Sequence, residues 1–274
     1  MRIRIDHATT YAYDRAARFI VQSLRMTPRS SEGQQVRHWR IETDVDARLR
    51  KSEDAFGNTV HTLYTEQPTN SLTVRVSGEV VTNDTAGVVP ADLETLSPLV
   101  FLRDTPLTQR DKLISVFASE FSAHPPLDRM HRLMAAIHGS VAFEVGVTTP
   151  THTAAEVLAL GRGVCQDHAH VFIACSRHMG VPARYVSGHL LRRDREDQEA
   201  GHAWAEAWIE GLGWVGFDPA NGVCPTDRYV RVATGLDYLG AAPVRGTSYG
   251  GSGERMAVSL NVRDADMQQS QQQA

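Results

Sequence analysis

Residues 201–208, Gly-His-Ala-Trp-Ala-Glu-Ala-Trp, constrain the fold most, because large and small side chains alternate strictly along them. Successive side chains of a β-strand point to opposite faces, so His202, Trp204, Glu206 and Trp208 share one face and three alanines share the other. Two tryptophans beside a histidine indicate a walled, partly dry cleft. An imidazole there can take a proton from a nucleophile and return it to a leaving group. The alternative is a core histidine satisfied by a backbone carbonyl.

A cysteine stands at the start of a predicted helix in the segment Gly-Arg-Gly-Val-Cys165-Gln-Asp. We expect this helix to run from Val164 to about His178, because Gly163 precedes it and Gly180 follows. Unpaired N–H groups and the positive end of the helix dipole stabilise a thiolate in the first turn, which suits a nucleophile. The alternative is a small buried apolar residue, as we expect for Cys175.

A third signal is the segment 213–219, a predicted strand that ends in Asp218 and is halted by Pro219. The Asp218 carboxylate can accept a hydrogen bond from His202 and fix its tautomer. An Asp-Pro pair by itself is more often a turn, so this signal depends on its combination with Cys165 and His202.

The spacing between His202 and Asp218 makes a geometric prediction, since the two lie on consecutive strands joined around residues 210–213. A two-residue turn at Gly211–Leu212 would place them on opposite faces of the sheet. We therefore predict an odd loop or a bulge, which pairs Asp218 with Trp204 and leaves His202 diagonally adjacent. Opposite faces would contradict a catalytic triad.

The organisation of the chain predicts an α+β protein with an N-terminal antiparallel β domain, formed as a sandwich or open barrel. We place this domain at residues 1–85, a proline-punctuated connector at 86–107, a core with C-terminal strands at 108–264, and a disordered, glutamine-rich tail at 265–274. The predicted N-terminal strands are Arg2–Tyr13, Phe19–Met26, Val36–Val45, Thr59–Thr65 and Leu72–Val81.

In the core we expect three helices besides the one that carries the cysteine, followed by strands. A capping box at Thr153 and Glu156 starts one of these helices. The glycine-rich residues 246–253 lack the lysine and the strand–helix context of a phosphate loop, so we expect a flexible connection there. The predicted elements are helices at Thr108–Phe121, Leu127–Val141 and Thr153–Leu160, and strands at Ala183–Leu191, His202–Glu210, Trp214–Asp218, Arg228–Val232 and Arg255–Val262.

The composition of the chain narrows the possible binding partners and the cellular compartment. The chain has 28 basic and 32 acidic residues, giving a net charge of −4 without basic patches, which argues against nucleic acid. Its opening residues alternate like a strand and lack the apolar core of a signal peptide, and no segment approaches a membrane span. Three cysteines, Cys165, Cys175 and Cys224, suit a reducing compartment, so we predict a cytoplasmic location. The sequence does not indicate the oligomeric state.

Four ordered motifs resemble the transglutaminase-like superfamily, specifically its bacterial members with an N-terminal β domain. They are GRGVCQDHAH (161–170), GVPARYVSGHL (180–190), GHAWAEAW (201–208) and GWVGFDPANG (213–222), and the likeness continues weakly over nearly the whole chain. The resemblance implies a papain-like core in which the nucleophile's helix packs on an antiparallel sheet. It also implies that Cys165, His202 and Asp218 form a Cys-His-Asp triad that needs no cofactor.

This sequence departs from the family pattern at four positions. His168, Gly201, Ala220 and Leu236 stand where an aromatic residue, serine, threonine and arginine are common. These departures bear on substrate preference more than on the chemistry. His168 lies close to the nucleophile on the same helix, so it is placed to perturb the charge of the thiol, with a sign that the sequence does not give.

The chemistry expected of this constellation is attack by the Cys165 thiolate on a peptide or glutamine-type amide, followed by a thioester intermediate. Water would resolve the thioester in a protease or amidase, and an amine in a transamidase. We favour hydrolysis slightly, because no loop obviously guards an acceptor site. The backbone N–H of Cys165 is one oxyanion donor, and Gln166 and the Trp204 indole are candidates for a second donor or for substrate binding.

Two other classes of protein compete with this interpretation. In a metal site, Cys165, Asp167, His168 and His170 would act together, but His170 points away on a helix and no Cys-x-x-Cys or His-Glu-x-x-His spacing occurs, so we predict no metal. In a non-catalytic binding module, the β domain would contact a partner and the core would be inactive. In an active enzyme, the same β domain is a candidate for substrate selection.

Overall fold

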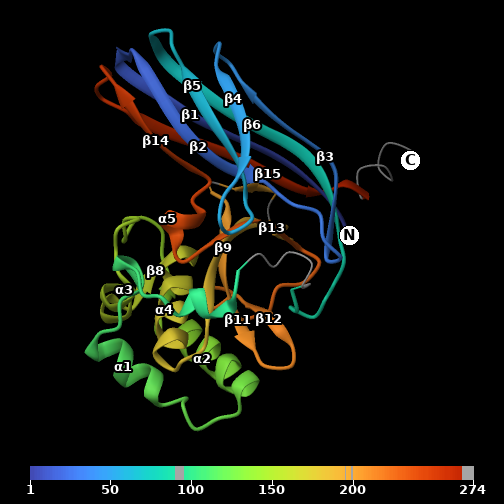
Figure 1. Cartoon of the computed structure of the whole chain (residues 1–274), viewed down its shortest axis with the longest axis vertical. Coiled ribbons are helices and arrows are strands. Elements are labelled where there is room, and N and C mark those ends of the chain that lie inside the picture. The colour runs from blue at the N-terminus through green and yellow to red at the C-terminus, as the bar shows by residue number, and fades with distance from the viewer. Residues whose placement is uncertain (90–95, 195, 199, 267–274) are drawn as a thin grey trace.

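Strands dominate both ends of the chain and helices its middle, so that a β-sandwich lies above an α+β core in Figure 1. The computed structural model describes residues 1–89, 96–194, 196–198 and 200–266. The mixture of helices and strands, with antiparallel sheets, confirms the predicted α+β fold class. The predicted tail at 265–274 lies outside the described residues except for its first two, and so do residues 90–95 of the predicted connector.

The sandwich consists of two antiparallel sheets whose strands bury every second side chain, as their sequence alternation predicts. Apolar side chains such as Tyr11, Leu24, Leu63 and Val74 fill the space between the sheets. One sheet has the order β10 (Asp197–Gln198), β15 (Arg255–Asp264), β1 (Arg2–Ala17), β6 (Thr69–Thr82) and β3 (Gln34–Thr43). The other has the order β14 (Val244–Tyr249), β2 (Phe19–Thr27), β5 (Thr59–Thr65) and β4 (Arg48–Glu53).

The last two strands complete the sandwich, although the sequence analysis grouped them with the core. Strand β15 pairs with β1 from Ile3–Asp264 to Ala12–Arg255, and β14 pairs with β2. Part of the predicted flexible connection at 246–253 is thus the paired strand β14. The alternation of side chains predicts a strand but does not say which strand it pairs with. Here the free edges of β1 and β2 provide the backbone hydrogen-bond partners that β15 and β14 need. Strand β4 was not predicted, because it is a mostly exposed edge strand.

In the core, an antiparallel sheet carries helix α4 (Cys165–His178) on one face. The sheet has the order β12 (Gly213–Phe217), β11 (His202–Ile209), β9 (Ala183–Leu190) and β13 (Tyr229–Gly235). The three alanines of β11 belong to the same buried cluster as the apolar residues of α4. The opposite face carries Trp204 and Glu206 toward the sandwich, where Arg231 joins Glu206 to Gln34.

Three helices pack on α4: α1 (Lys112–Ser119), α2 (Pro126–Ser140) and α3 (Ala154–Leu160), whereas the short α5 (Tyr238–Ala241) packs on β13 and β9. The predicted capping box is confirmed, since Thr153 accepts from the N–H of Glu156 and the Glu156 carboxylate accepts from that of Thr153. Helix α1 starts later than predicted, because residues 106–108 form the 3-10 turn η3 and Asp111 caps the helix. A second 3-10 turn, η2, covers Pro98–Leu102. None of the described helices is long and apolar enough to cross a membrane.

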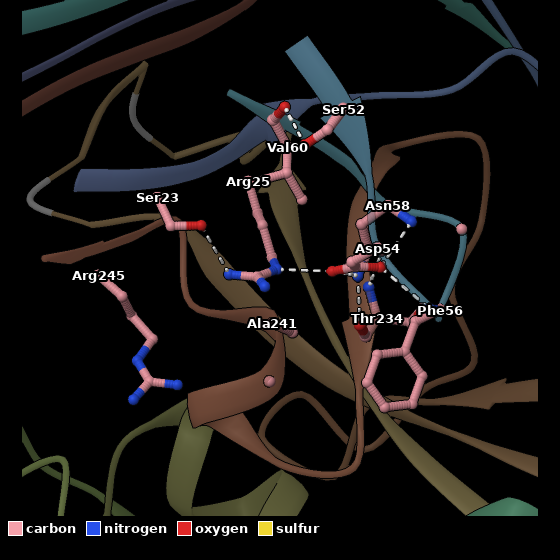
Figure 2. Close-up of polar contacts among 12 residues, drawn as sticks. Ser23, Arg25, Ser52, Asp54, Phe56, Asn58, Val60, Thr234, Ala241 and Arg245 are labelled. Carbon is pink, nitrogen blue, oxygen red and sulfur yellow. Dashed lines mark hydrogen bonds and ion pairs between the residues drawn. The ribbon is translucent and has the colours of Figure 1, made fainter. Parts of the chain in front are cut away.

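Strand β13 joins the core to the sandwich. Its residues Val230 and Val232 pack in one cluster with Ile3 and Ile5 of β1. Figure 2 shows Asn58, from the turn between β4 and β5, beside Thr234 of β13. The Asn58 amide donates to the Thr234 carbonyl at 2.7 Å and accepts from the Thr234 N–H at 2.8 Å. Apolar packing and paired hydrogen bonds therefore fix β13 from the sandwich side.

Candidate active site

Cys165 is the first residue of α4, and the chain before it is held in place by hydrogen bonds to Asp167 in the same turn. The Asp167 carboxylate folds back to accept from the Val164 N–H at 2.8 Å and from the Thr148 hydroxyl at 2.7 Å. A side chain at Gly163 would collide with Asp167, since a Cβ there would lie 2.6 Å from its oxygen. Cys165 itself is half-buried, so its thiol lies beside first-turn N–H groups at the edge of the core.

The structure brings Cys165, His202 and Asp218 together. The Nε2 atom of His202 lies 2.7 Å from Oδ2 of Asp218, whose side chain is fully buried, while the His202 side chain is 11% exposed. Cys165 lies close enough to His202 for its thiol to help raise the pKa of the imidazole. Because Nε2 faces the carboxylate, Nδ1 is the ring nitrogen left for the thiol. The three groups thus form a chain in the order cysteine, histidine, aspartate.

The strand register confirms the odd loop predicted between His202 and Asp218. Strands β11 and β12 pair from Ile209–Gly213 to Ala205–Phe217, which leaves three residues in the loop. Gly211 in this loop has φ 83°, a conformation that favours glycine. One further step along the register places Asp218 opposite Trp204, so His202 lies diagonally adjacent on the same face, as predicted.

Electrostatics favour a charged histidine. Burial alone would lower the pKa of His202, but the charge and hydrogen bond of Asp218, together with those of Cys165, raise this pKa to about 10. Burial would likewise raise the pKa of Asp218, but the charge of His202 and hydrogen bonds from His202, Asn221 and Tyr229 lower it. At neutral pH the pair is therefore an imidazolium and a carboxylate.

Two residues that the sequence analysis did not single out hold the carboxylate. The Tyr229 hydroxyl donates to Oδ2 of Asp218 at 2.8 Å, and the Asn221 amide donates to the same oxygen at 2.6 Å. The other oxygen accepts from the backbone N–H groups of Ala220 and Asn221. The turn-forming segment after Asp218 was a signal for Asn221. No spacing pointed to Tyr229, because it reaches the site from strand β13.

The two other predicted site residues have different settings. The Trp204 ring stacks on His202 at 6.2 Å and is 2% exposed, so it forms a wall behind the imidazole. Gly188 of β9 leaves room for this ring, since a Cβ there would lie 2.8 Å from it. Gln166 is half-buried beside Cys165, and its amide makes a long contact of 3.5 Å with the Pro150 carbonyl.

The two other cysteines, and the histidines His170 and His189, have settings of their own. Burial raises the pKa of both Cys175 and Cys224. His170 accepts from the Tyr238 N–H, and His189 lies against the ring of His7. Within the described ranges, no group of three or more histidine, cysteine or acidic residues is placed to hold a metal ion.

An α+β core with adjoining cysteine, histidine and aspartate, set beneath a β-sandwich, defines a transglutaminase-like protein. A model of the bacterial transglutaminase-like N-terminal region matches residues 3–81, and a model of the transglutaminase-like superfamily matches residues 116–219. The chain belongs to the transglutaminase-like superfamily, as the sequence motifs predicted.

Relatives span nearly the whole chain. An uncharacterized protein of Mycobacterium leprae (strain TN) is 30% identical over 95% of this chain and 96% of its own length. An uncharacterized protein of Mycobacterium tuberculosis (strain H37Rv) is also 30% identical, over 95% and 91%. The fold matches a crystal structure from Cytophaga hutchinsonii named "Putative Cysteine Protease", with a TM-score of 0.78, 22% identity, and 97% and 92% coverage. The family supports a cysteine-based enzyme in general and does not distinguish hydrolysis from transamidation.

Proposed function

We propose that the protein hydrolyses peptide or glutamine-type amide bonds through a thioester on Cys165, with His202 as base and acid and Asp218 as the group that orients His202. The observation that carries this proposal is the position of His202, which is bound through Nε2 to a buried carboxylate and lies near the thiol of Cys165, at the start of α4. A protein or peptide is the substrate that this chemistry fits. No cofactor is needed, because nucleophile, base and orienting carboxylate are all side chains.

The proposed reaction runs in two halves. The thiolate of Cys165 attacks the amide carbonyl carbon, the C–N bond breaks, and His202 gives its Nδ1 proton to the departing amine. Water then attacks the thioester while Nδ1 takes a proton from it, which releases the carboxylic acid and restores the thiolate–imidazolium pair. Throughout, Asp218 holds the Nε2 proton, so that Nδ1 remains the atom that exchanges protons.

Oxyanion stabilisation is assigned to the first turn of α4. The backbone N–H of Cys165 has no partner within the helix and lies beside the attacking sulfur. Of the two candidates for a second donor, we favour Gln166, because its amide is held only by the long contact to Pro150. The Trp204 indole is a weaker candidate, since the ring is buried behind the imidazole.

We favour hydrolysis over transamidation because Cys165 is half-buried and the His202 side chain is partly exposed, so water can reach the thioester. An assay with a protein substrate and a fluorescent primary amine separates the two reactions. Hydrolysis gives new termini or free ammonia without label on the substrate. Efficient incorporation of the amine into glutamine side chains would reverse the preference.

The test of the proposed function is iodoacetamide labelling across pH 4 to 9, followed at each cysteine by mass spectrometry. Cys165 should react selectively near or below neutral pH and lose this selectivity in His202→Ala. Cys175 and Cys224 are internal controls, because burial raises the pKa of both thiols. Equal, slow labelling of all three cysteines would refute an activated nucleophile and favour a non-catalytic binding module. The cytoplasmic location and the lack of a nucleic-acid or membrane partner stay predictions from the sequence.

A further inference from the structure

His168 has two backbone carbonyls as its polar partners. It lies three residues after Cys165 on α4 and is 1% exposed. Its Nδ1 is 2.8 Å from the carbonyl oxygen of Val164, and its Nε2 is 2.8 Å from that of Val141. A carbonyl oxygen only accepts hydrogen bonds, and a neutral imidazole has one N–H. Only the doubly protonated imidazolium donates to both oxygens, whereas a neutral ring would set one buried nitrogen lone pair against a carbonyl.

Other neighbours of His168 also suit a positive charge. The ring of Phe143 stacks against it at 6.3 Å with an interplanar angle of 28°, which presents an aromatic face to the imidazole. The adjacent residue, Asp167, is fully buried, and its Oδ1 has no hydrogen-bond partner in the described part of the chain. An aromatic face therefore accompanies the two carbonyl acceptors, and the adjacent residue carries a buried carboxylate.

His170 provides a contrast on the same helix. Its Nε2 accepts from the backbone N–H of Tyr238 at 3.1 Å, so this nitrogen must carry a lone pair. Burial lowers the pKa of His170 to about 4, although Asp237 opposes this and Arg177 adds to it. Two buried histidines, separated by one residue, therefore need opposite protonation states. His170 must be neutral to accept a hydrogen bond, whereas His168 faces two carbonyl oxygens that can only accept.

The charges around His168 are few. On the neighbouring strands β7 (Ala142–Phe143) and β8 (Arg162–Gly163), Arg162 forms an exposed ion pair with Glu144 at 3.3 Å, so these two charges offset each other. At the end of α2, His138 contacts the Pro219 carbonyl instead of His168. On its own helix His168 has Asp167 and the Cys165 thiol within one turn, and His202 lies beyond that thiol.

We propose that His168 is a cationic positioning residue that stabilises the Cys165 thiolate. Residues three apart on a helix share a face, with their Cβ atoms about 5–6 Å apart, and the side chain of His168 leans back toward the turn of Cys165. A buried cation on that face favours the thiolate over the thiol and so lowers the midpoint pH of thiol alkylation. This inference rests on the proposed function, because it assigns the thiolate its role.

The protonation state is measured directly by NMR of the full chain labelled with ¹⁵N-histidine, with the His168 signals assigned by their loss in His168→Phe. At pH 8, both ring nitrogens of His168 should be protonated, with slowly exchanging N–H protons. His170 should show one protonated nitrogen in the same spectrum. An unprotonated ring nitrogen on His168 at pH 8 would overturn the proposal, whatever the activity of the protein.

The effect on the thiol is measured by the pH dependence of Cys165 alkylation in three variants. His168→Phe keeps an aromatic ring and His168→Gln keeps a polar donor, and both should raise the midpoint by about one pH unit. His168→Lys restores a cation and should bring the midpoint back toward the wild-type value. His178→Gln, at the far end of the helix, is the matched control and should leave it unchanged.

The outcomes separate this inference from the proposed function. An unchanged midpoint in folded His168→Phe and His168→Gln refutes the role of His168 but leaves Cys165 as the nucleophile. Wild-type Cys165 that reacts no faster than Cys224 refutes both the nucleophile and its stabilisation, while the NMR spectrum still decides the charge of His168. If the substitutions prevent folding, the ring signals of His168 are assigned in the wild type through its own backbone and Cβ resonances, which separates them from those of His202, the other histidine expected to be doubly protonated. The wild-type spectrum then remains decisive for the imidazolium.

Discussion

Replacing Asp218 by asparagine tests how far the site depends on one buried carboxylate. Its Oδ2 accepts from His202, Tyr229 and Asn221, and its Oδ1 accepts from two backbone N–H groups. If the oxygen of the asparagine side chain still accepts from the two backbone N–H groups, its NH₂ group points toward the imidazole of His202. The His202 proton must then move from Nε2 to Nδ1, the nitrogen that faces the thiol. In that tautomer His202 cannot accept the proton of Cys165.

The magnitude follows from the pKa of His202, which the site raises from its usual 6.5 to about 10. This difference corresponds to about 5 kcal/mol in favour of the imidazolium. Asp218 contributes more to this rise than Cys165 does, so removing the carboxylate should cost at least half of it, ~2.5 kcal/mol, and lower the thiolate–imidazolium population by at least about 10²-fold. The wrong tautomer should reduce turnover further, by about 10⁴-fold in total.

The assay is the second-order rate of Cys165 alkylation at pH 6, with folding verified by urea denaturation. Asp128→Asn is the matched control, because Asp128 forms an exposed ion pair with Arg132 on α2. The control should react at the wild-type rate, and Asp218→Asn about 10²-fold more slowly. A folded Asp218→Asn protein that is alkylated at the wild-type rate would refute the assignment of Asp218 as the group that holds the imidazolium.

The pH dependence of the free energy of unfolding provides a second test of Asp218→Asn. The folded pKa of His202 lies above its unfolded value, so the folded state binds the proton more tightly. The resulting stabilisation is fully present below pH 6.5 and is lost as the pH rises toward about 10. The free energy of unfolding of the wild type should fall across that window. In Asp218→Asn the decline should be much smaller.

Three further predictions concern the support of the site and the domain interface. Tyr229→Phe removes one hydrogen bond to the Asp218 carboxylate and should lower the free energy of unfolding by about 1.5–3 kcal/mol in urea titrations. Gly188→Ala places a Cβ 2.1 Å from a carbonyl oxygen of β13 and should cost about 1–3 kcal/mol, whereas Gly139→Ala, with open space around it, should not destabilise. Burial and a second histidine lower the pKa of His189 to about 3, so calorimetry should show the melting temperature falling as the pH drops from 6.5 toward 3, and falling less in His189→Gln.

The sequence predicted those parts of the site that obey local rules. Strand alternation placed His202 and Trp204 on one face, and the same rule required the odd loop that puts Asp218 beside them. The glycines that flank the predicted helix located Cys165 at the start of α4. Each of these predictions depends on residues within about one element of each other, where periodicity and turn chemistry suffice.

Contacts between distant segments could not be predicted in this way. The partner of β15 is β1, at the other end of the chain, and alternation is the same whichever strand completes the ladder. Tyr229 reaches Asp218 from a different strand. The position of His168 near the thiol was evident from the sequence, but the sign of its effect was not, because one of its two carbonyl partners belongs to Val141, outside the helix.

These long-range contacts change what the β domain can be expected to do. Gln34 of β3 exchanges hydrogen bonds with the backbone of Arg231 at 2.8 and 2.9 Å, and Asn58 does the same with Thr234, so the sandwich fixes both halves of β13. Strand β13 begins at Tyr229, which donates to the carboxylate that orients the histidine. Deleting residues 1–85 would remove these contacts from β13, leave β14 without β2, and leave β15 with only the two-residue β10 as partner. Lost activity would therefore not demonstrate substrate selection. The sandwich therefore helps to hold Asp218 of the proposed triad in place, because Tyr229, which donates to its carboxylate, lies on a strand that the sandwich contacts.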